Sequence, residues 1–541
     1  MSPVGAAVAP GDSSCTVSFR DTPLQIVNPV LAMRLRSRTD RQPLSGNRQR
    51  ARSSSDLSAT KDGSMNSTVT PNDLLLAHAS AGPAVPVWLV SEKSDLSALK
   101  LDAAARAWAE ANKFKGSARK LLPLPASDGG LSGVLFGIGD GNTGDPAGPG
   151  ALLCGTLPAQ LPPATYELQG AGADAELAAI AWGLGAYRFR RYKTTAKGDE
   201  MACLRLDKSI DRARVLAIVE AIWLGRDLIN TPASDLGPAD LEDATRKLGE
   251  RHGATVRSVI GDDLLTQNFP MIHAVGRASP RAPRLIDLQW QRTGGRPDAP
   301  RISLVGKGIC FDTGGLDLKP SSAMLLMKKD MGGAATVLAL GSMIMALGLD
   351  VRLRVLVSAA ENSVSGNAFR PQDVIKTRDG RTVEIGNTDA EGRLVLSDAL
   401  SLADEESPDL LLTFSTLTGA ARVALGPDLP PFYTDDEALA GQIASTGLAL
   451  GDPMWRMPFW SGYEKNLDSE VADMGNVSES PFAGSIIAAL FLRRFVKRAR
   501  RFAHFDIYGW RQALRPLGPK GGETQGARAM LSVIERMTTR S

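Results

Sequence analysis

Five short apolar segments alternate with helix-like segments after residue 231, and this pattern constrains the fold more than any other feature. Apolar strands that alternate with helices predict a mixed, mainly parallel sheet covered by helices on both faces. Ligands bind such sheets at the carboxyl ends of the strands. Charged residues directly after each strand are therefore the first candidates for a site. The five segments are RLIDLQWQ, RISLVGKG, VRLRVLVSAA, DLLLTFSTLTG and FAHFDIYGW.

The length of 541 residues is too great for one ordinary core, so we expect two α/β domains. Residues 65–205 carry short apolar runs such as VPVWLV and GVLFGIG between helix-like segments, which predicts a smaller N-terminal domain. Apolar residues at helical spacing predict a linker helix over residues 206–230, ending at Asn-Thr-Pro. Residues 231–541 would form the larger C-terminal domain. The Gly-rich stretch at 137–144 fits a turn after a strand better than a phosphate-binding loop.

Residues 1–64 are rich in Ser, Arg, Gly and Pro and show no apolar period, which predicts a disordered basic extension. An organelle transit peptide is disfavoured by Asp12, Asp21 and the absence of an amphipathic pattern. The segment is read as an unstructured extension, or as sequence upstream of a true start at Met65. Nine Lys or Arg against five Asp give this segment a formal charge of +4, in a chain whose total is +3. The remainder is near neutral, which gives no support to nucleic-acid binding.

Composition and cysteine usage are those of a globular protein from a reducing compartment, and we expect a cytoplasmic location. Hydrophobic residues make up 43% and charged residues 22%, and the four cysteines are widely spaced. No signal peptide is apparent. The uncharged run at 331–349 reaches the length of a membrane span, but its small residues and flanking charged strands favour a buried helix, so no membrane partner is expected.

Seven charged residues cluster in Gly-rich segments that follow successive strand candidates. The segment GKGICFDTGGLDLKPSSAMLLMKKDMGGAA follows one strand, and IGNTDAEGRLVLSDAL comes after the next. Any one of these residues alone would more often be a helix cap, a solvated turn or half of a surface ion pair, but their joint placement points to one pocket. The residues are Lys307, Asp312, Lys319, Asp330, Asp389, Glu391 and Arg393.

Four carboxylates in one pocket would repel strongly unless cations offset their charge. Two divalent cations would do so, since carboxylates can bridge two metals that together act on a water and a carbonyl oxygen. Only four histidines are present, and no HExxH helix occurs, so a His-rich zinc site is disfavoured. If the segment at 389–393 is extended, its alternate residues point the same way. Asp389 and Glu391 would then both reach metal, and Arg393 would reach an anion.

These segments closely resemble the signatures of the leucyl aminopeptidase (cytosol aminopeptidase) family, the M17 dinuclear metallopeptidases. The resemblance is carried by VGKGICFDTGGLDLKP, MKKDMGGAA and NTDAEGRL, and it extends from about Arg226 to the C-terminus. It implies a metal-dependent aminopeptidase that hydrolyses the N-terminal peptide bond of peptides through a water or hydroxide bridging two metal ions, Zn²⁺ or Mn²⁺. It also implies a homohexamer.

The resemblance also assigns roles. Asp312 and Glu391 would bridge the metals, Lys307 and Asp330 would complete one site, and Asp389 the other. Lys319 would polarise the substrate carbonyl, and Arg393 would hold bicarbonate as general base. An apolar pocket would receive leucine-like or other apolar first side chains. The substrate-binding residues would be Met327, Asn387, Thr416, Leu417 and Gly419.

Two segments depart from the family pattern and concern substrate preference and subunit contacts more than the reaction. They are ETQGARAM, in place of a TGRP-like segment, and FAGSIIAA, in place of a Gly-Gly-Ala stretch.

Two other functions are alternatives to the enzyme. One alternative is a DNA-binding or regulatory role for an aminopeptidase-like hexamer with a basic tail, but the near-neutral remainder of the chain makes nucleic acid a poor partner. A catalytically dead scaffold is disfavoured because every metal-binding position is intact.

Overall fold

The computed structural model of the chain describes residues 69–140, 149–170, 174–194 and 200–538. The predicted extension 1–64 and Cys15 lie outside these ranges, as does the second half of the Gly-rich stretch at 137–144. The unit formed by the rest of the chain is mixed α/β, as the sequence predicted.

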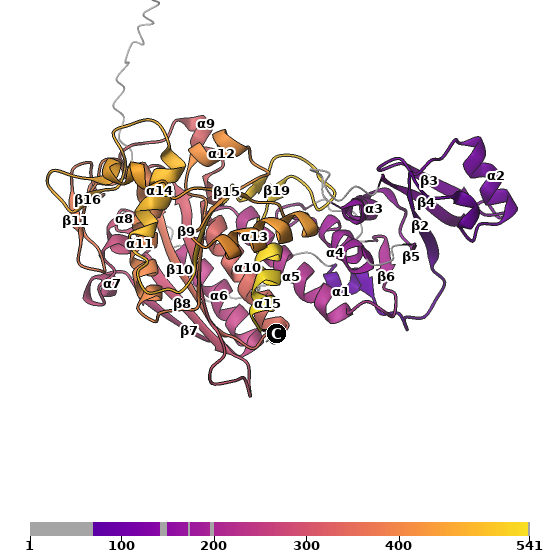
Figure 1. Cartoon of the computed structure of the whole chain (residues 1–541), viewed down its shortest axis with the longest axis horizontal. Coiled ribbons are helices and arrows are strands. Elements are labelled where there is room, and N and C mark those ends of the chain that lie inside the picture. Colours follow the sequence, from indigo (N-terminus) through magenta and orange to yellow (C-terminus); the bar gives the residue numbers. More distant parts are fainter. Residues whose placement is uncertain (1–68, 141–148, 171–173, 195–199, 539–541) are drawn as a thin grey trace, which may run out of the picture. The chain divides into compact units, whose positions relative to one another are not determined.

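The first part of this unit contains a six-stranded sheet in the order β1-β6-β5-β2-β4-β3 (Figure 1). All neighbours are parallel except β3 and β4. The apolar runs VPVWLV and GVLFGIG lie in β2 and β4. The strands are β1 (Leu75–Leu76), β2 (Val85–Ser91), β3 (Leu121–Pro125), β4 (Leu131–Gly139), β5 (Thr165–Gln169) and β6 (Cys203–Arg205), and the helices are α1 (Pro71–Leu74), η1 (Leu96–Ala98), α2 (Ala103–Ala111), η2 (Gly150–Thr156), α3 (Leu157–Gln160) and α4 (Ala175–Gly185).

The second part is built on an eight-stranded sheet in the order β15-β14-β17-β13-β9-β10-β8-β7. Its four central strands, β17, β13, β9 and β10, are parallel, whereas β14, β8 and β7 join antiparallel to their inner neighbours. The mixed, mainly parallel sheet is therefore confirmed. The strands are β7 (Thr255–Ile260), β8 (Arg284–Gln291), β9 (Arg301–Asp312), β10 (Arg352–Asn362), β13 (Leu410–Ser415), β14 (Pro431–Tyr433), β15 (Trp455–Met457) and β17 (Phe502–Asp506).

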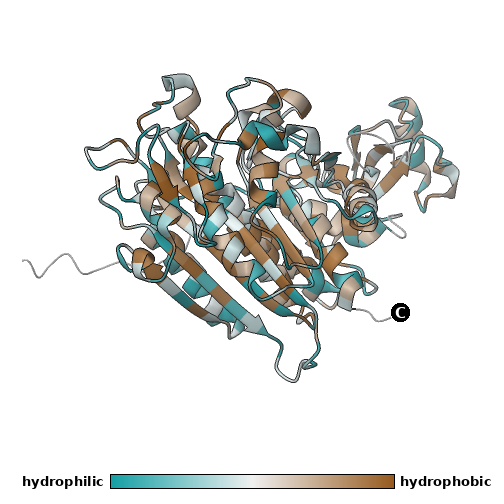
Figure 2. Cartoon of the chain, turned by 60° about the vertical axis from the view of Figure 1, so that its left-hand side comes forward, coloured by the Kyte–Doolittle hydropathy of each residue, from teal (hydrophilic) through white to brown (hydrophobic). Residues whose placement is uncertain are grey.

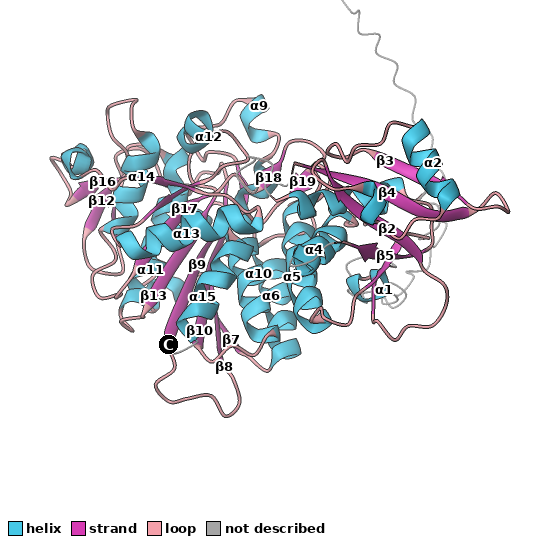
Figure 3. Cartoon of the chain, turned by 45° about the vertical axis from the view of Figure 1, so that its right-hand side comes forward, coloured by secondary structure: helices cyan, strands magenta, loops and turns pink. Residues whose placement is uncertain are grey.

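Helices cover both faces of the large sheet, so its central strands are apolar on both sides (Figures 2 and 3). Neighbouring residues of β9 belong to different cores: Leu304 packs in the core shared with α6, α10 and α15, and Val305 in the one shared with α8, α11 and α14. The helices of this part are α6 (Pro238–His252), α7 (Asp263–Thr266), α8 (Pro270–Gly276), α9 (Ser321–Met324), η4 (Met327–Met331), α10 (Gly332–Ala346), η5 (Thr388–Ala390), α11 (Glu391–Asp404), α12 (Gly419–Leu425), α13 (Glu437–Leu450), η6 (Ser461–Leu467), α14 (Gly484–Arg493) and α15 (Ala527–Thr538).

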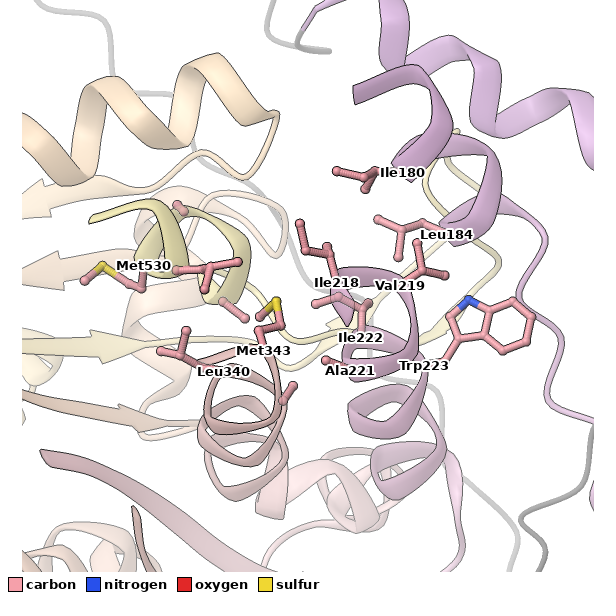
Figure 4. Close-up of a cluster of buried hydrophobic side chains, with 14 of the residues drawn as sticks. Ile180, Leu184, Ile218, Val219, Ala221, Ile222, Trp223, Leu340, Met343 and Met530 are labelled. Carbon is pink, nitrogen blue, oxygen red and sulfur yellow. The ribbon is translucent and has the colours of Figure 1, made fainter. Parts of the chain in front are cut away.

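Helix α5 (Arg212–Asn230) follows the six-stranded sheet and is capped by Asp211, whose side chain accepts a hydrogen bond from the Arg214 N–H. Its apolar residues recur at three- and four-residue spacing, so they cover two sides of the helix. In Figure 4, α5 lies between α4 and α10, with Val219 beside Leu184 and Ile222 facing Met343. The long helix expected over residues 206–230 is therefore present and largely buried, but it begins at Arg212.

Two small sheets complete the fold: β11 (Val374–Lys376), β12 (Thr382–Glu384) and β16 (Met474–Gly475) form one, and β18 (Trp510–Arg511) with β19 (Gly521–Gly522) the other. The uncharged run at 331–349 forms most of α10, which is almost entirely buried. Among the described residues, no helix has both the length and the apolar character needed to cross a membrane.

Candidate metal centre

The predicted site residues lie on strand β9, on the segment that follows it, and in η5 and the start of α11, after the short strand β12. Lys307 and Asp312 belong to β9 itself, and the chain beyond β9 carries Lys319 and then Asp330 in η4. The chain that follows β13 leads to α12, and α9 and α12 lie near each other in two views of the molecule (Figures 1 and 3). The site thus occupies the position expected for a parallel sheet.

Lys307 stands at the centre of the cluster. Its Nζ lies 2.6 Å from Asp330 Oδ2 and 2.8 Å from Glu391 Oε1, and it donates a hydrogen bond to the Thr416 carbonyl at 3.2 Å. The side chain reaches these groups by passing over Gly392, where an added Cβ would lie 2.7 Å from Lys307 Cε and Nζ. Glycine at this position of α11 is therefore required by the path of the lysine.

Lys319 connects the other two carboxylates. Its Nζ lies 2.9 Å from Asp312 Oδ2 and forms a shorter ion pair with Asp389 Oδ1. Asp312 is fixed by hydrogen bonds to its Oδ1 from the Gly314 N–H at 2.9 Å and from Asn362 Nδ2 at 3.0 Å. The structure thus brings both predicted lysines and all four predicted carboxylates into one cluster.

The donor set fits a divalent cation. Carboxylate oxygens of Asp312, Asp330 and Glu391, all buried, lie within 4.8 Å of one another, and no other such group of three occurs in the described part of the chain. Asp330 Oδ2, Glu391 Oε1 and Asp389 Oδ1 are buried and accept no aligned hydrogen bond, although lysine nitrogens lie near them. Hard oxygen atoms left in this state are ligands that a divalent metal ion would satisfy.

The pKa values of the cluster reflect burial and crowding. Burial, with Asp312 adding to its effect, raises the pKa of Glu391 to about 8, against the opposing charge of Lys307. Burial and Asp312 likewise raise the pKa of Asp389 to about 6, against Lys319. Burial alone would lower the pKa of Lys307. The surrounding carboxylates raise this pKa by more than burial lowers it, so it lies above that of an ordinary lysine. The carboxylates are thus short of positive charge, which bound metal ions would supply.

The segment that carries Asp389, Glu391 and Arg393 is helical, and the expectation of an extended segment was wrong. Asp389 lies in η5, and Glu391 and Arg393 lie in the first turn of α11. The turn begins at Asn387, whose side chain accepts a hydrogen bond from the Asp389 N–H at 2.7 Å. Glu391 therefore sits at a helix N-terminus, where the helix dipole favours a carboxylate.

Arg393 faces a backbone carbonyl that sequence reasoning did not identify. Its NH1 donates to the Asn476 carbonyl at 2.6 Å, while the buried Nε has no hydrogen-bond partner among the described residues. The Asn476 side chain also accepts from the Gly386 N–H at 2.7 Å and donates to the Asn387 carbonyl at 2.8 Å. Asn476 lies 83 positions from Arg393 in a segment without apolar period, so no local signal pointed to it.

Thr416 and Leu417 follow β13 and are held from two sides. The Thr416 hydroxyl donates to Asp330 Oδ1 at 2.7 Å, and the buried Asp506 carboxylate accepts hydrogen bonds from the Leu417 N–H at 2.9 Å and the Thr418 N–H at 3.1 Å. Sequence reasoning missed Asp506. The signal was present, because Asp506 ends the apolar strand β17 just as Asp312 ends β9.

A cavity of about 230 Å³ adjoins the cluster beside Asp389 and Arg393. Of the predicted substrate-binding residues, Asn387, Leu417 and Gly419 line this cavity, whereas Met327 and Thr416 lie outside its lining. Met327 begins η4, three residues before Asp330. The other lining residues are Ala390, Thr418, Val477 and Gly484.

Comparison with known proteins identifies the family. The model of the cytosol aminopeptidase family, catalytic domain, matches residues 223–531. The chain belongs to the cytosol aminopeptidase family. The model of the M17 aminopeptidase N-terminal domain also matches, over residues 85–206. This family membership makes the chain a metal-dependent aminopeptidase.

Individual members of the cytosol aminopeptidase family are similar to this protein over much of its length. A probable cytosol aminopeptidase of Rhodococcus opacus (strain B4) is 40% identical over 381 residues, which are 67% of this chain and 74% of the relative. The crystal structure of the cytosol aminopeptidase from Coxiella burnetii is 42% identical, covers 86% of this chain and 100% of its own, and has a TM-score of 0.80. The bottromycin maturation enzyme BotP in complex with Mn is 31% identical, covers 85% of this chain and 100% of its own, and has a TM-score of 0.75.

Proposed function

We propose that the protein releases N-terminal residues from peptides by hydrolysis at a centre of two divalent metal ions. The observation that carries this proposal is the buried cluster in which oxygens of Asp312, Asp330 and Glu391 lie within 4.8 Å of one another, with Lys307 and Lys319 between them. The complex of BotP with Mn is a related solved structure that holds a divalent metal.

The ligand assignment of the family fits these side chains. Asp312 and Glu391 would bridge the two ions, Lys307 and Asp330 would complete one site, and Asp389 the other. Lys307 would bind metal only as the neutral amine, so its ammonium proton would have to leave. Zn²⁺ or Mn²⁺, when bound, would lower the pKa of a water and polarise the substrate carbonyl.

Lys319 and Arg393 would act on the substrate and on an anion. Carboxylates hold the pKa of Lys319 above its ordinary value despite burial, so its Nζ keeps a proton and can donate to the developing oxyanion. Arg393 has a buried Nε without a partner in the described residues, next to a cavity large enough for a small anion. We therefore propose that Arg393 binds bicarbonate, which would accept a proton from the attacking water.

The first side chain of the substrate would lie near Met327, Thr416, Leu417 and Gly419. An added Cβ on Gly419 would meet no atom within 4 Å, so the start of α12 leaves room for substrate. The apolar Met327 and Leu417 suit leucine-like or other apolar side chains. A free α-amine bound at the metals would limit the enzyme to the N-terminal bond.

The experiment is hydrolysis of aminoacyl amides by protein that has been chelated and then supplied with Zn²⁺ or Mn²⁺. We expect activity to disappear on chelation and to return in proportion to bound metal, up to two ions per chain. Activity that survives verified metal removal would refute the proposal. N-acetyl-leucyl amide, which lacks a free amine, serves as the matched control substrate and should not be hydrolysed.

We also propose a cytoplasmic homohexamer, by analogy with the family. Light scattering of the full chain would measure the assembly, and a mass other than that of six chains would overturn this part. The regulatory alternative that involves DNA rests on arginines outside the described residues and stays a prediction.

A further inference from the structure

The chain beyond β17 borders the proposed pocket for the first side chain. The Ile507 N–H donates to the Ser415 carbonyl at 2.8 Å, so this chain runs beside the one that carries Thr416. Two residues on, a Cβ added to Gly509 would lie 3.0 Å from Thr416 Cγ2. Tyr508 lies between these two contacts and is half-buried, so its backbone runs beside Thr416, which is proposed to border the pocket.

Gln525 fixes the position of Tyr508. Its Oε1 accepts hydrogen bonds from the Tyr508 and Gly509 N–H groups, both at 3.0 Å, and its Nε2 donates to the Pro427 carbonyl at 2.8 Å. Gln525 belongs to ETQGARAM, one of the two segments that depart from the family pattern. This departing segment thus holds the backbone of the chain that runs beside Thr416.

Two cations flank the Tyr508 ring. Lys329 Nζ lies 4.7 Å and the Arg422 guanidinium carbon 5.5 Å from the ring centroid. Lys329 is buried, at 5% exposure, whereas Arg422 is exposed on α12, one turn after Gly419. Neither side chain forms a hydrogen bond or ion pair with any described residue. A buried ammonium without a carboxylate partner is costly, and contact with an aromatic ring compensates for only part of that cost.

Nearby carboxylates do not neutralise Lys329 because other partners engage them. Asp330 accepts a hydrogen bond from Thr416 and pairs with Lys307. Asp506 accepts four hydrogen bonds, two from backbone N–H groups and two from the hydroxyls of Thr418 and Ser485. The chain beside Thr416 therefore carries two cationic side chains, Lys329 and Arg422, that form no ion pair within the described part of the chain.

We propose that this pocket accepts acidic first side chains, Glu or Asp, as well as apolar ones, and that Lys329 and Arg422 bind the side-chain carboxylate beside Tyr508. The carboxylate supplies the negative charge that the two cations lack, and its bonds to both would be charge-assisted. This inference rests on the proposed aminopeptidase function and adds a substrate class to it.

The test compares kcat/KM of the metal-loaded full chain for glutamyl, aspartyl, glutaminyl and leucyl amides. We expect glutamyl amide to be hydrolysed at least about tenfold better than the isosteric glutaminyl amide, since a hydrogen bond to a charged group is stronger than one to a neutral group. Leucyl-glutamate, in which the carboxylates belong to the second residue, shows whether the cations instead serve that residue. A Lys329-dependent preference for leucyl-glutamate over leucyl-glutamine would overturn the assignment to the first side chain.

Variants of Lys329 test whether this side chain causes the preference for glutamyl over glutaminyl amide. Lys329→Met should lower the ratio of glutamyl to glutaminyl hydrolysis about tenfold, mainly through KM, and Lys329→Arg should retain the ratio. Lys328→Met is the matched control, because it removes the same charge one position earlier, where Nζ already donates to the Asn230 carbonyl at 2.6 Å.

Two outcomes overturn the inference: a wild-type enzyme that cleaves leucyl amide but not glutamyl or aspartyl amide, or a ratio that Lys329→Met leaves unchanged. If no amide is cleaved by metal-loaded protein, the proposed aminopeptidase function has failed instead. The wild-type comparison stands even if a variant does not fold.

Discussion

The buried carboxylate of Asp506 accepts a hydrogen bond from the Thr418 hydroxyl at 2.6 Å. The same hydroxyl accepts the Ala421 N–H at 3.0 Å, so Thr418 caps α12 while it is held by β17. Together with the two backbone N–H groups bound to Asp506, this contact fixes the chain that borders both the metal ligands and the substrate cavity.

Replacement of Asp506 by Asn should weaken substrate binding. Asn offers one acceptor oxygen in place of two, so the Thr418 hydroxyl or the two N–H groups lose a partner. We expect Asp506→Asn to raise KM for leucyl amide about tenfold, with a smaller change in kcat. Thr418→Ser, which keeps the hydroxyl, is the control for Thr418→Val, which removes it. Wild-type KM values in both Asp506→Asn and Thr418→Val would show that this contact does not position substrate.

Thr416 should tune metal affinity through Asp330. Its hydroxyl orients the carboxylate by donating to Oδ1, and loss of such a contact typically weakens metal binding about 10- to 100-fold. Thr416→Val should show this loss in competition with a chelating dye. Thr416→Ser should retain near wild-type affinity, and equal affinities for the Val and Ser variants would contradict the role.

Arg393 should make the rate depend on bicarbonate. We expect Arg393→Met to lower kcat at least about 100-fold, the size of a general-base contribution, and to abolish stimulation by added bicarbonate. The metal content should stay unchanged, because Arg393 hydrogen-bonds to the Asn476 carbonyl and forms no hydrogen bond or ion pair with the proposed metal ligands in the described part of the chain. Arg498→Met removes an exposed arginine and is the matched control. If added bicarbonate still stimulates Arg393→Met, the anion does not bind at Arg393.

Stability should depend on pH through Asp227 in α5. Burial raises the pKa of Asp227 from 3.8 to about 6, although Tyr187 donates a hydrogen bond to its Oδ1 at 2.7 Å. The folded pKa exceeds the unfolded one, so the folded state binds the proton more tightly. The ionised Asp227 carboxylate therefore destabilises the folded state. This effect is absent below about pH 4, grows up to about pH 6 and is constant at higher pH.

Asp227→Asn should therefore raise the free energy of unfolding at pH 8 by up to about 3 kcal/mol, at ~1.4 kcal/mol per pKa unit, and so raise Tm; the gain should vanish near pH 4. Tyr187→Phe removes the hydrogen bond to the carboxylate and should lower Tm more at pH 8 than at pH 4. A Tm difference between wild type and Asp227→Asn that does not vary with pH would contradict this assignment.

Much of the fold followed from the sequence because its signals were local. The apolar strands and the buried run at 331–349 were read from composition and period alone, and acidic residues after strands located Asp312 and Asp330. The segment at 389–393 was misjudged, because alternating charges suit an extended chain as well as the first turn of a helix capped by Asn387. Asn476 and Gln525 act through contacts with residues distant in sequence or through backbone groups, and such contacts leave no periodic signal.

The most direct test of the central claim is hydrolysis of leucyl amide by Glu391→Gln protein whose fold and metal content have been measured. Glu391 lies within reach of Asp312, Asp330 and Lys307, so the account makes it indispensable to the metal centre. We predict that wild-type protein carries two divalent ions per chain and cleaves the amide, and that Glu391→Gln remains folded without measurable hydrolysis. Wild-type-like hydrolysis by Glu391→Gln in a metal-verified sample would contradict the account.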